Sequence, residues 1–388
     1  MKKMKKLPIL LSALLLTSAL APLSACEEEP TFFPSVTIGQ ADGEVSYQPT
    51  ISGEFDKVEI PLLSGDIYTV CANYTRCITA DYNVNGRDCF APTPVSISWE
   101  CDEAALYYTL DISTDEDMED AESYVTFDNS VTLNYLFMGY DYYYQISAKY
   151  QDKLVKSRIF EFSTAYLPRT VYVDDNVTNT RDWGGYMAED GKRVKQGIVY
   201  RGGALENITE EGKYVMLAEL GIKTDLDVRG DSGSPLTSSP LGADVNYIET
   251  KGPYYVGNYG AGIDMVGEYQ EALAREIRTF ANPDNFPVYV HCSLGRDRTG
   301  TLCFLINALL GVSKLDIYRD YELSLMSRVR GDNPKYMVDS AFTALYNYID
   351  RYQRNKTLQE NAEAFMLSIG ITEAEIEAIK TNMLEEVK

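Results

Sequence analysis

In this chain of 388 residues, the sequence predicts an α/β domain with a mostly parallel central sheet flanked by helices, preceded by an all-β sandwich module. Over residues 66–165, short strand-like runs follow one another with turn residues between them, which is typical of β-sandwiches. Over residues 166–388, strand-like and helix-like stretches alternate, as in α/β domains. Helical apolar spacing occurs at residues 264–280 and 337–352, and Thr372 with Glu375 has the pattern of a capping box.

The first residues have the composition of a targeting segment. Four lysines lie among the first six residues, and an apolar stretch runs from Leu7 to about Leu23. A basic segment, an apolar segment and then small residues indicate a signal peptide, which we place at residues 1–25. The sequence Leu-Ser-Ala-Cys ending at Cys26 resembles the lipobox of bacterial lipoproteins. It implies lipidation of Cys26 and an exported chain anchored in the cell envelope, at the periplasmic face or the cell surface. An uncleaved transmembrane anchor is the alternative.

The next two segments are interpreted as a tether and a sandwich module. Residues 26–65 mix Pro, Gly and polar residues, which favours a tether. In the module, Trp99 lies in an early strand and Leu136 precedes Tyr142 by six residues, as in a tyrosine corner, so residues 66–165 resemble a fibronectin type III module. The expected strands span residues 94–100, 105–112, 131–136, 142–148 and 156–163.

Four cysteines lie in or beside this module. In a chain expected to be exported, they suggest two disulfides, with three possible connectivities. A zinc site is the alternative, although the spacings lack a Cys-x2-Cys pair and no histidine is near. These residues are Cys71, Cys77, Cys89 and Cys101.

Residues 286–310 predict a strand, a tight glycine-containing loop and the start of an apolar helix. The first turn of a helix has N–H groups without intrahelical partners, so a loop wrapped there can bind a phosphate group. Cys292 lies at the start of this loop. A helix N-terminus and nearby cations lower the pKa of a thiol from about 8.5, which makes Cys292 a candidate nucleophile. The alternative is that Cys292 is only a small buried apolar residue, as we expect for Cys303 in the following helix.

The residues after Cys292 fit the same chemistry. Arg298 follows by six residues, and its planar guanidinium can bind two phosphate oxygens. Thr299 can donate a hydrogen bond to the sulfur when water cleaves a phosphocysteine. His291, the only histidine, is expected to orient the loop and help keep the thiol ionised. The remaining loop residues are expected to bind the phosphate: Ser293, Leu294, Gly295 and Arg296.

The stretch His-Cys-Ser-Leu-Gly-Arg-Asp-Arg-Thr-Gly at residues 291–300 resembles the phosphate loop of the Cys-x5-Arg protein tyrosine phosphatase superfamily. Its Asp-Arg-Thr-Gly ending is similar to the atypical, secreted bacterial branch with tyrosine and phosphoinositide phosphatase activity. The chain departs from that branch at Arg296, where lysine is usual, and at Asp225, where an apolar residue is usual. Further blocks that resemble this branch lie at residues 179–185, 194–205, 220–229 and 317–324, so the resemblance covers roughly the last 220 residues.

The resemblance implies phosphomonoester hydrolysis through a phosphocysteine, with neither a metal nor another cofactor. The leaving oxygen then needs a proton donor, for which the branch suggests Asp227 or Asp297. Asp227 and Arg229 end one predicted strand, and His291 and Cys292 end another, so both pairs should meet at one crevice. We therefore expect Arg229 to help bind substrate and Asp227 to be the acid, with Asp297 as the alternative. Asp227 can instead serve only as a helix cap or as the partner of an arginine.

The composition also bears on partners. The net charge of −23 disfavours nucleic acid, because a polyanion would be repelled. The expected substrates are phosphotyrosine proteins, or phosphoinositides and inositol phosphates. Residues 250–260 are rich in Gly and Tyr and are either a lid or an ordinary loop. The alternative function is a phospho-ligand binding or adhesion lipoprotein whose phosphatase domain is inactive. Such a binding protein would have no need of an intact nucleophile.

Overall fold

The computed structural model describes most of the chain in several segments. Residues 32–37 and 44–45 are described as strands, and the longer segments span residues 95–101, 104–164, 169–229, 236–250, 268–326 and 340–387. The expected signal peptide with Cys26, most of the expected tether, residues 251–260 of the candidate lid and three of the cysteines (Cys71, Cys77 and Cys89) lie outside the described residues. Within these ranges, no helix combines the length and apolar character needed to cross a bilayer.

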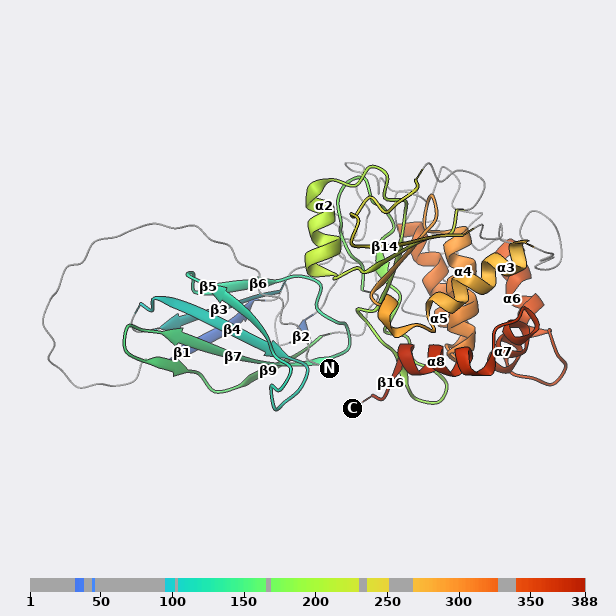
Figure 1. Cartoon of the computed structure of the whole chain (residues 1–388). Coiled ribbons are helices and arrows are strands. Elements are labelled where there is room, and N and C mark those ends of the chain that lie inside the picture. The colour runs from blue at the N-terminus through green and yellow to red at the C-terminus, as the bar shows by residue number, and fades with distance from the viewer. Residues whose placement is uncertain are drawn as a thin grey trace, which may run out of the picture.

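The N-terminal part forms two β-sheets around one apolar core (Figure 1). Its strands are β1 (Phe32–Thr37), β2 (Glu44–Val45), β3 (Val95–Cys101), β4 (Tyr107–Ser113), β5 (Glu122–Thr126), β6 (Ser130–Leu133), β7 (Asp141–Lys149), β8 (Leu154–Lys156) and β9 (Phe160–Thr164). The smaller sheet has the order β1-β3-β6, and the larger has the order β2-β9-β7-β4-β5, with β8 beside β7. Ile97 of the smaller sheet and Leu110 and Ile146 of the larger sheet belong to the same buried cluster.

This part differs from the sequence-based expectation in three respects. The run expected over residues 156–163 is two strands, β8 and β9, because Ser157 interrupts the ladder: its hydroxyl accepts a hydrogen bond from Ile146 N at 3.0 Å. Strand β5, whose side chains are mostly exposed, was not expected. Cys101 was expected in a disulfide, but it is a free thiol whose sulfur lies 3.2 Å from the hydroxyl oxygen of Tyr150.

A five-stranded sheet organises the C-terminal part. Its strands are β10 (Arg181–Asp182), β12 (Val199–Gly202), β13 (Thr224–Asp227), β14 (Asn246–Glu249) and β15 (Val288–His291). Their order is β10-β12-β15-β13-β14, and only β10 runs antiparallel to its neighbour. This mostly parallel sheet confirms the expected α/β class. Gly202 and Asp227 both pair in register with His291, so the carboxyl ends of three strands lie side by side.

The two faces of this sheet pack against different elements because successive strand residues point to opposite sides. Val288 and Val290 of β15 pack in a large cluster with α4 (Asp297–Leu309), whereas Tyr289 between them packs in a second cluster with Met216 of η3 (Val215–Glu219). Figure 1 shows α2 (Glu210–Tyr214) on one side of the sheet and most of the helices on the other. The sheet is therefore covered on both faces.

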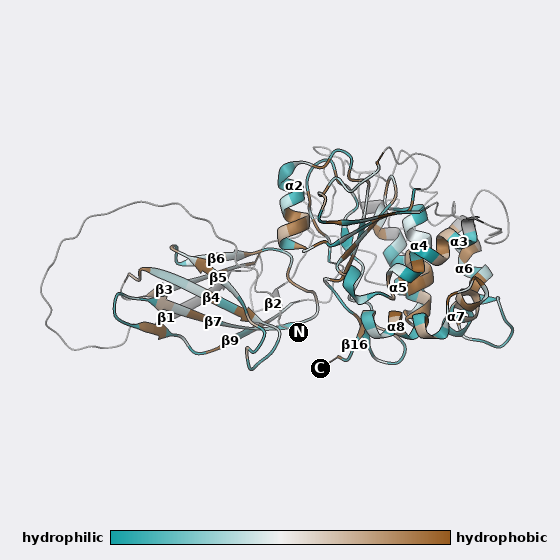
Figure 2. Cartoon of the chain, in the orientation of Figure 1, coloured by the Kyte–Doolittle hydropathy of each residue, from teal (hydrophilic) through white to brown (hydrophobic). Residues whose placement is uncertain are grey.

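The remaining helices follow in sequence order. They are α3 (Glu268–Thr279), η6 (Pro283–Asn285), α5 (Lys314–Glu322), η7 (Leu323–Met326), α6 (Ser340–Asp350), α7 (Leu358–Ser368) and α8 (Glu373–Met383). Both polar and apolar segments occur along them (Figure 2). In contrast, α4 is buried over nearly its whole length. The expected capping box of Thr372 and Glu375 is confirmed at the start of α8.

Polar contacts join the two parts of the chain. The side chain of Gln196 donates to the carbonyl of Met138 at 2.7 Å and accepts from the N–H of Met138 at 2.9 Å. The guanidinium of Arg193 in β11 (Arg193–Val194) lies 3.7 Å from the ring centre of Tyr140. It also pairs at 2.8 Å with Glu385 of β16 (Leu384–Glu385), the strand that pairs with β11.

Candidate active site

The loop that the sequence singles out joins β15 to α4. His291 ends β15, and α4 begins at Asp297. Gly295, between them, has a φ of 65°, and a Cβ on this residue would lie 2.1 Å from the carbonyl oxygen of Gly202 in β12. Any side chain here would clash with backbone, so glycine is required for the loop to close against the sheet.

Hydrogen bonds from distant residues hold the carbonyl groups of this loop. Asn179 Nδ2 donates to the carbonyl of Leu294 at 3.0 Å, and Arg201 Nη2 donates to the carbonyls of Gly295 and Arg296 at 2.9 and 3.3 Å. Since the N–H and C=O of a trans peptide point in opposite directions, carbonyls held on the outside leave the amides facing the interior of the loop. The loop thus presents donors to an anion, as the sequence predicts.

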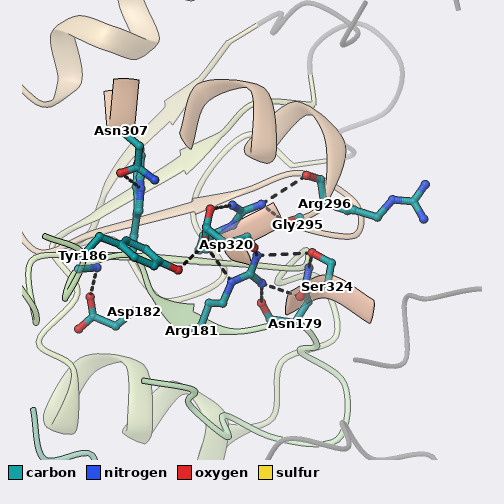
Figure 3. Close-up of polar contacts among 12 residues, drawn as sticks. Asn179, Arg181, Asp182, Tyr186, Gly295, Arg296, Asn307, Asp320 and Ser324 are labelled. Carbon is teal, nitrogen blue, oxygen red and sulfur yellow. Dashed lines mark hydrogen bonds and ion pairs between the residues drawn. The ribbon is translucent and has the colours of Figure 1, made fainter. Parts of the chain in front are cut away.

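Arg201 belongs to a buried ion-pair network behind the loop. Asp320 of α5 pairs with Arg201 and, at 3.3 Å, with Arg181 of β10. Arg181 also donates to the carbonyl of Asp320 and to Oδ1 of Asn179, both at 2.6 Å, and Figure 3 shows these side chains converging with Ser324 of η7. The three charged side chains are at most 3% exposed. Breaking one of these buried pairs would leave an uncompensated charge, which costs free energy. The network therefore holds the loop in a fixed position.

Cys292 lies at the start of the loop and is 6% exposed. Burial raises the pKa of its thiol, but the hydroxyl of Thr299 and the N–H groups of Thr299 and Leu294 outweigh burial, so the pKa lies below its ordinary value. The Thr299 hydroxyl is buried and has no other hydrogen-bond partner in the described part of the chain, so it is available to the sulfur. The surroundings of Cys292 therefore favour a thiolate.

Cys303, in the helix that follows the loop, provides a contrast to Cys292. It is fully buried, and burial raises the pKa of its thiol to about 12. A thiol that stays protonated at neutral pH is neither a nucleophile nor a metal ligand. The expectation that Cys303 is a core residue agrees with its place in the apolar cluster under the sheet.

Arg298 lies in the first turn of α4 and is half-buried. Its guanidinium donates to the carbonyl of Arg229, which lies two residues beyond the end of β13. Burial lowers the pKa of Arg229. Asp227 pairs in register with His291, so the end of β13 lies beside the start of the loop. The two strand ends meet there, as the sequence predicts.

His291 lies on the side of the loop that faces away from solvent. Its side chain is fully buried, with Nε2 2.8 Å from Oδ1 of Asp225 and Nδ1 3.3 Å from the carbonyl oxygen of Cys292. Burial lowers the pKa of His291, but the Asp225 carboxylate outweighs burial and the pKa is raised. His291 thus connects β13 to the backbone of the loop.

Asp227 ends β13 as expected, and its carboxylate is occupied by Arg229. Oδ1 accepts from Arg229 N and Nε at 3.0 and 2.8 Å, Oδ2 accepts from Nη2 at 2.6 Å, and the hydroxyl of Tyr247 donates to Oδ2 at 3.1 Å. The side chain is fully buried, and Arg229 also pairs with Glu206. This geometry matches the alternative in which Asp227 serves as the partner of an arginine.

Asp297, the first residue of α4, is more accessible. Its side chain is 16% exposed, and both of its carboxylate oxygens lie 3.0 Å from Nε of Arg296. The hydroxyl of Tyr321 donates to Oδ1 at 2.9 Å. Ser293 and Leu294 are exposed beside it, with Leu294 44% exposed, so they form the rim of the loop.

Glu276 of α3 lies near Arg298 and has a perturbed carboxyl group. It is 2% exposed, and burial raises its pKa to about 8, although the Thr250 hydroxyl donates to it at 2.6 Å and the charge of Arg298 favours the ionised form. In an unfolded chain, the pKa of a glutamate carboxyl is about 4.3. The folded state therefore binds this proton more tightly, and this group lowers the stability of the fold as the pH rises from about 4 to 8.

We expect Glu276→Gln to raise the melting temperature at pH 7.5, because glutamine removes a carboxyl that ionises freely in the unfolded chain but not in its buried site. At pH 4 the carboxyl is protonated in the folded chain and mostly protonated in the unfolded chain, so the two melting temperatures should differ little. Thermal unfolding at both pH values measures the difference. An equal shift at pH 4 and pH 7.5 would show that packing, rather than ionisation, causes it.

Several residues of the site were not predicted from sequence. Arg201 and Asp320 lie inside blocks that carried the family resemblance, but nothing local indicates that they meet. Asp225 stood out only as a charged residue in an apolar strand. Glu276 lies beside Leu273 and Ile277 on the apolar face of α3, and a carboxylate on such a face is a signal that could have indicated it. No group of three or more His, Cys, Asp or Glu residues that could hold a metal occurs among the described residues.

A model of the tyrosine phosphatase family matches residues 174–385, which include the five-stranded sheet, the loop and the helices around it. The chain belongs to the tyrosine phosphatase family. It is a phosphoric monoester hydrolase that acts on phosphorylated substrates. The family expected from the loop is thereby confirmed.

This tyrosine phosphatase is similar to several known proteins. It is 25% identical over 233 residues to a Cupriavidus necator protein that carries the name of a tyrosine-protein phosphatase, covering 54% of this chain and 72% of that protein. It is 23% identical over 201 residues to the tyrosine-protein phosphatase of Nostoc commune, covering 43% and 68%. The core catalytic domain of the PP-IP phosphatase Siw14 from S. cerevisiae is 18% identical, with a TM-score of 0.28 over 44% of this chain and 89% of that one.

Proposed function

We propose that this phosphatase hydrolyses phosphotyrosine in proteins through a phosphocysteine formed on Cys292, without a metal ion. The observation that carries the proposal is the convergence, in one loop, of a buried thiol with a lowered pKa, inward-facing amides and the guanidinium of Arg298. Amides and guanidinium together can neutralise a phosphate dianion, which is the task a metal performs in other phosphatases. The names of the relatives support tyrosine as the phosphorylated residue.

In the first step, the Cys292 thiolate attacks phosphorus, so that the S–P bond forms as the bond from phosphorus to the leaving oxygen breaks. The loop amides and Arg298 bind the non-bridging oxygens and hold the phosphorus in line with the sulfur. An acid donates a proton to the leaving oxygen, which departs as an alcohol or phenol.

In the second step, water attacks the phosphocysteine, and the P–S bond breaks as the new P–O bond forms. The thiolate leaves, stabilised by the Thr299 hydroxyl and the same amides that lower the Cys292 pKa. The carboxylate that donated its proton accepts one from the attacking water, which restores the acid and releases inorganic phosphate.

We assign the acid to Asp297 in preference to Asp227. Both carboxylates contact an arginine, but Asp227 is fully buried with Arg229, whereas Asp297, beside Arg296, is 16% exposed at the loop. A proton donor must lie within hydrogen-bond reach of the leaving oxygen, directly or through one water. A phosphate dianion in the loop also favours the protonated form of a neighbouring carboxyl.

The rim of the loop supports phosphotyrosine over more highly charged substrates. Leu294 is 44% exposed there and offers an apolar contact to an aromatic ring, while the charge of Arg296 is partly offset by Asp297 at 3.0 Å. The test compares kcat/KM for a phosphotyrosine peptide, a phosphoserine peptide and a soluble phosphoinositide. We expect the phosphotyrosine peptide to lead by at least about tenfold. A higher kcat/KM for the phosphoinositide would contradict the proposed substrate class but not the proposed phosphocysteine chemistry.

The activity itself is tested with p-nitrophenyl phosphate in the presence of EDTA. We expect turnover to be unaffected by the chelator. A wild-type protein that binds vanadate without hydrolysing p-nitrophenyl phosphate would favour the alternative of a phospho-ligand binding lipoprotein.

We also propose that the mature protein is a lipoprotein of the bacterial cell envelope, anchored through Cys26. Support comes from the basic and apolar composition of residues 1–25 and from the Leu-Ser-Ala-Cys sequence that ends at Cys26. We expect Cys26→Ala to move the protein from the membrane fraction to the soluble fraction and to abolish labelling by a fatty acid. Membrane association that persists in the variant would indicate an uncleaved anchor instead.

The N-terminal sheets are proposed to be a fibronectin type III-like module that separates the catalytic part from the anchor. The Tyr142 hydroxyl accepts a hydrogen bond from Phe137 N at 2.6 Å, which resembles the contact of a tyrosine corner. Trp99 and Leu136 are buried in the same core. Comparison of an experimental structure of this module with fibronectin type III domains would test the assignment through its strand order.

A further inference from the structure

Asp225 is the second residue of β13, a strand whose four residues are all buried. Its side chain is fully buried, and both carboxylate oxygens have partners. Oδ1 lies 2.8 Å from Nε2 of His291, and Oδ2 accepts a hydrogen bond at 2.7 Å from the hydroxyl of Ser239, itself 6% exposed. A buried carboxylate without partners is costly, so these two contacts explain how a charged residue is tolerated where an apolar one is usual.

The contacts of His291 specify its protonation. Nε2 faces the carboxylate of Asp225, and Nδ1 faces the carbonyl oxygen of Cys292 at 3.3 Å. Both neighbours are acceptors. A neutral imidazole has one N–H and would set its bare nitrogen against a lone pair, whereas an imidazolium donates at both positions. The geometry therefore fits a cation that lies between Asp225 and the backbone of Cys292.

Other charged and titratable groups also lie around the imidazole. On β13, Asp227 favours the cation in addition to Asp225, while Arg229, just beyond the strand, opposes it. On β15, the ring of Tyr289 lies 5.7 Å from the imidazole, centre to centre. On β12, the residue in register with His291 is Gly202, which has no side chain. Asp225, the closest opposite charge, is thus the group on which the charge of His291 depends.

We propose that Asp225 is a positioning residue that holds His291 as an imidazolium against the Cys292 carbonyl and thereby keeps the Cys292 thiol ionised. Ser239 holds the far oxygen of the carboxylate, so the chain of contacts runs from the segment after β13, through two strands, to the nucleophile. The inference rests on the proposed role of Cys292. It assigns to Asp225, which departs from the usual pattern of the branch, a function in the reaction.

The first test measures the ionisation of Cys292 directly, by the pH dependence of its alkylation with iodoacetamide followed by mass spectrometry. We expect Asp225→Asn, which keeps an acceptor but removes the charge, to raise the pKa of the Cys292 thiol by about one unit. Ser239→Ala should raise it by less. The acid limb of the pH profile of kcat/KM on p-nitrophenyl phosphate should move in the same direction, so that the loss is about tenfold at low pH and small at pH 8.

Asp182→Asn is the matched control, because Asp182 is another fully buried strand carboxylate of this sheet, paired with Arg169 at 2.5 Å. It should leave the Cys292 thiol and the pH profile unchanged. Ser239→Ala, a milder change, provides the answer if Asp225→Asn does not fold. A folded Asp225→Asn protein with wild-type alkylation and a wild-type pH profile would overturn the proposal. The alkylation readout needs no turnover, so it separates this failure from that of the proposed function, which would appear as an active Cys292→Ser protein.

Discussion

Replacing Cys292 with serine should lower kcat on p-nitrophenyl phosphate by about 10⁴-fold or more. The serine hydroxyl remains protonated at neutral pH, so the contacts that favour a thiolate at this position have no anion to stabilise. The loop amides and Arg298 persist, and the binding of inorganic phosphate should therefore stay within about threefold of wild type. The rate is measured by a stopped assay, and phosphate binding by isothermal titration calorimetry, which needs no turnover. Substantial remaining activity would remove Cys292 from its role.

Arg298→Lys should be nearly as damaging, with a loss of about 10²–10⁴-fold in kcat, because a lysine makes a point contact where the guanidinium binds two oxygens. Lysine would also lose the contact to the Arg229 carbonyl that fixes the side chain across the crevice. Arg275→Lys in α3 is the control, since Arg275 is exposed and should tolerate the change. A near-normal rate for Arg298→Lys would mean that another cation binds the phosphate.

The core of the site was predictable because it is continuous in sequence. Strand, turn, glycine and helix N-terminus follow one another between His291 and Gly300, and the spacing of Cys292 and Arg298 is set by the turn itself. The alternation of strands and helices also predicted a mostly parallel sheet, and therefore that the ends of β13 and β15 would meet. The sequence pattern was sufficient for those parts of the site whose structure depends on residues close together in the chain.

What supports the loop was not predictable, because its parts are far apart in the chain. Arg201 reaches Asp320 across 119 positions, and Asp225 reaches His291 across 66. Hydropathy and periodicity report which face of an element is buried, but not which buried charge meets which. The same limit applies to Asp227, since the sequence left open whether it donates a proton or pairs with an arginine.

The general acid is decided by comparing Asp297→Asn with Asp227→Asn on two substrates. p-Nitrophenolate leaves readily without a proton, whereas the tyrosine of a phosphopeptide does not, so loss of the true acid should cost far more with the peptide. We expect Asp297→Asn to lower kcat on the peptide by about 10²-fold or more, with a much smaller loss on p-nitrophenyl phosphate.

Asp297→Asn should also remove the basic limb of the pH profile, because no group is then left whose deprotonation slows the first step. Asp227→Asn should instead slow both substrates alike and lower the melting temperature, since it leaves the buried guanidinium of Arg229 without its bidentate carboxylate. Tyr321→Phe serves as a second control: it removes the hydrogen bond to Oδ1 of Asp297 but keeps the carboxyl, so the basic limb should shift and remain visible. If the selective loss on the peptide falls on Asp227→Asn, then Asp227 is the acid, and the pair with Arg229 must open when substrate binds.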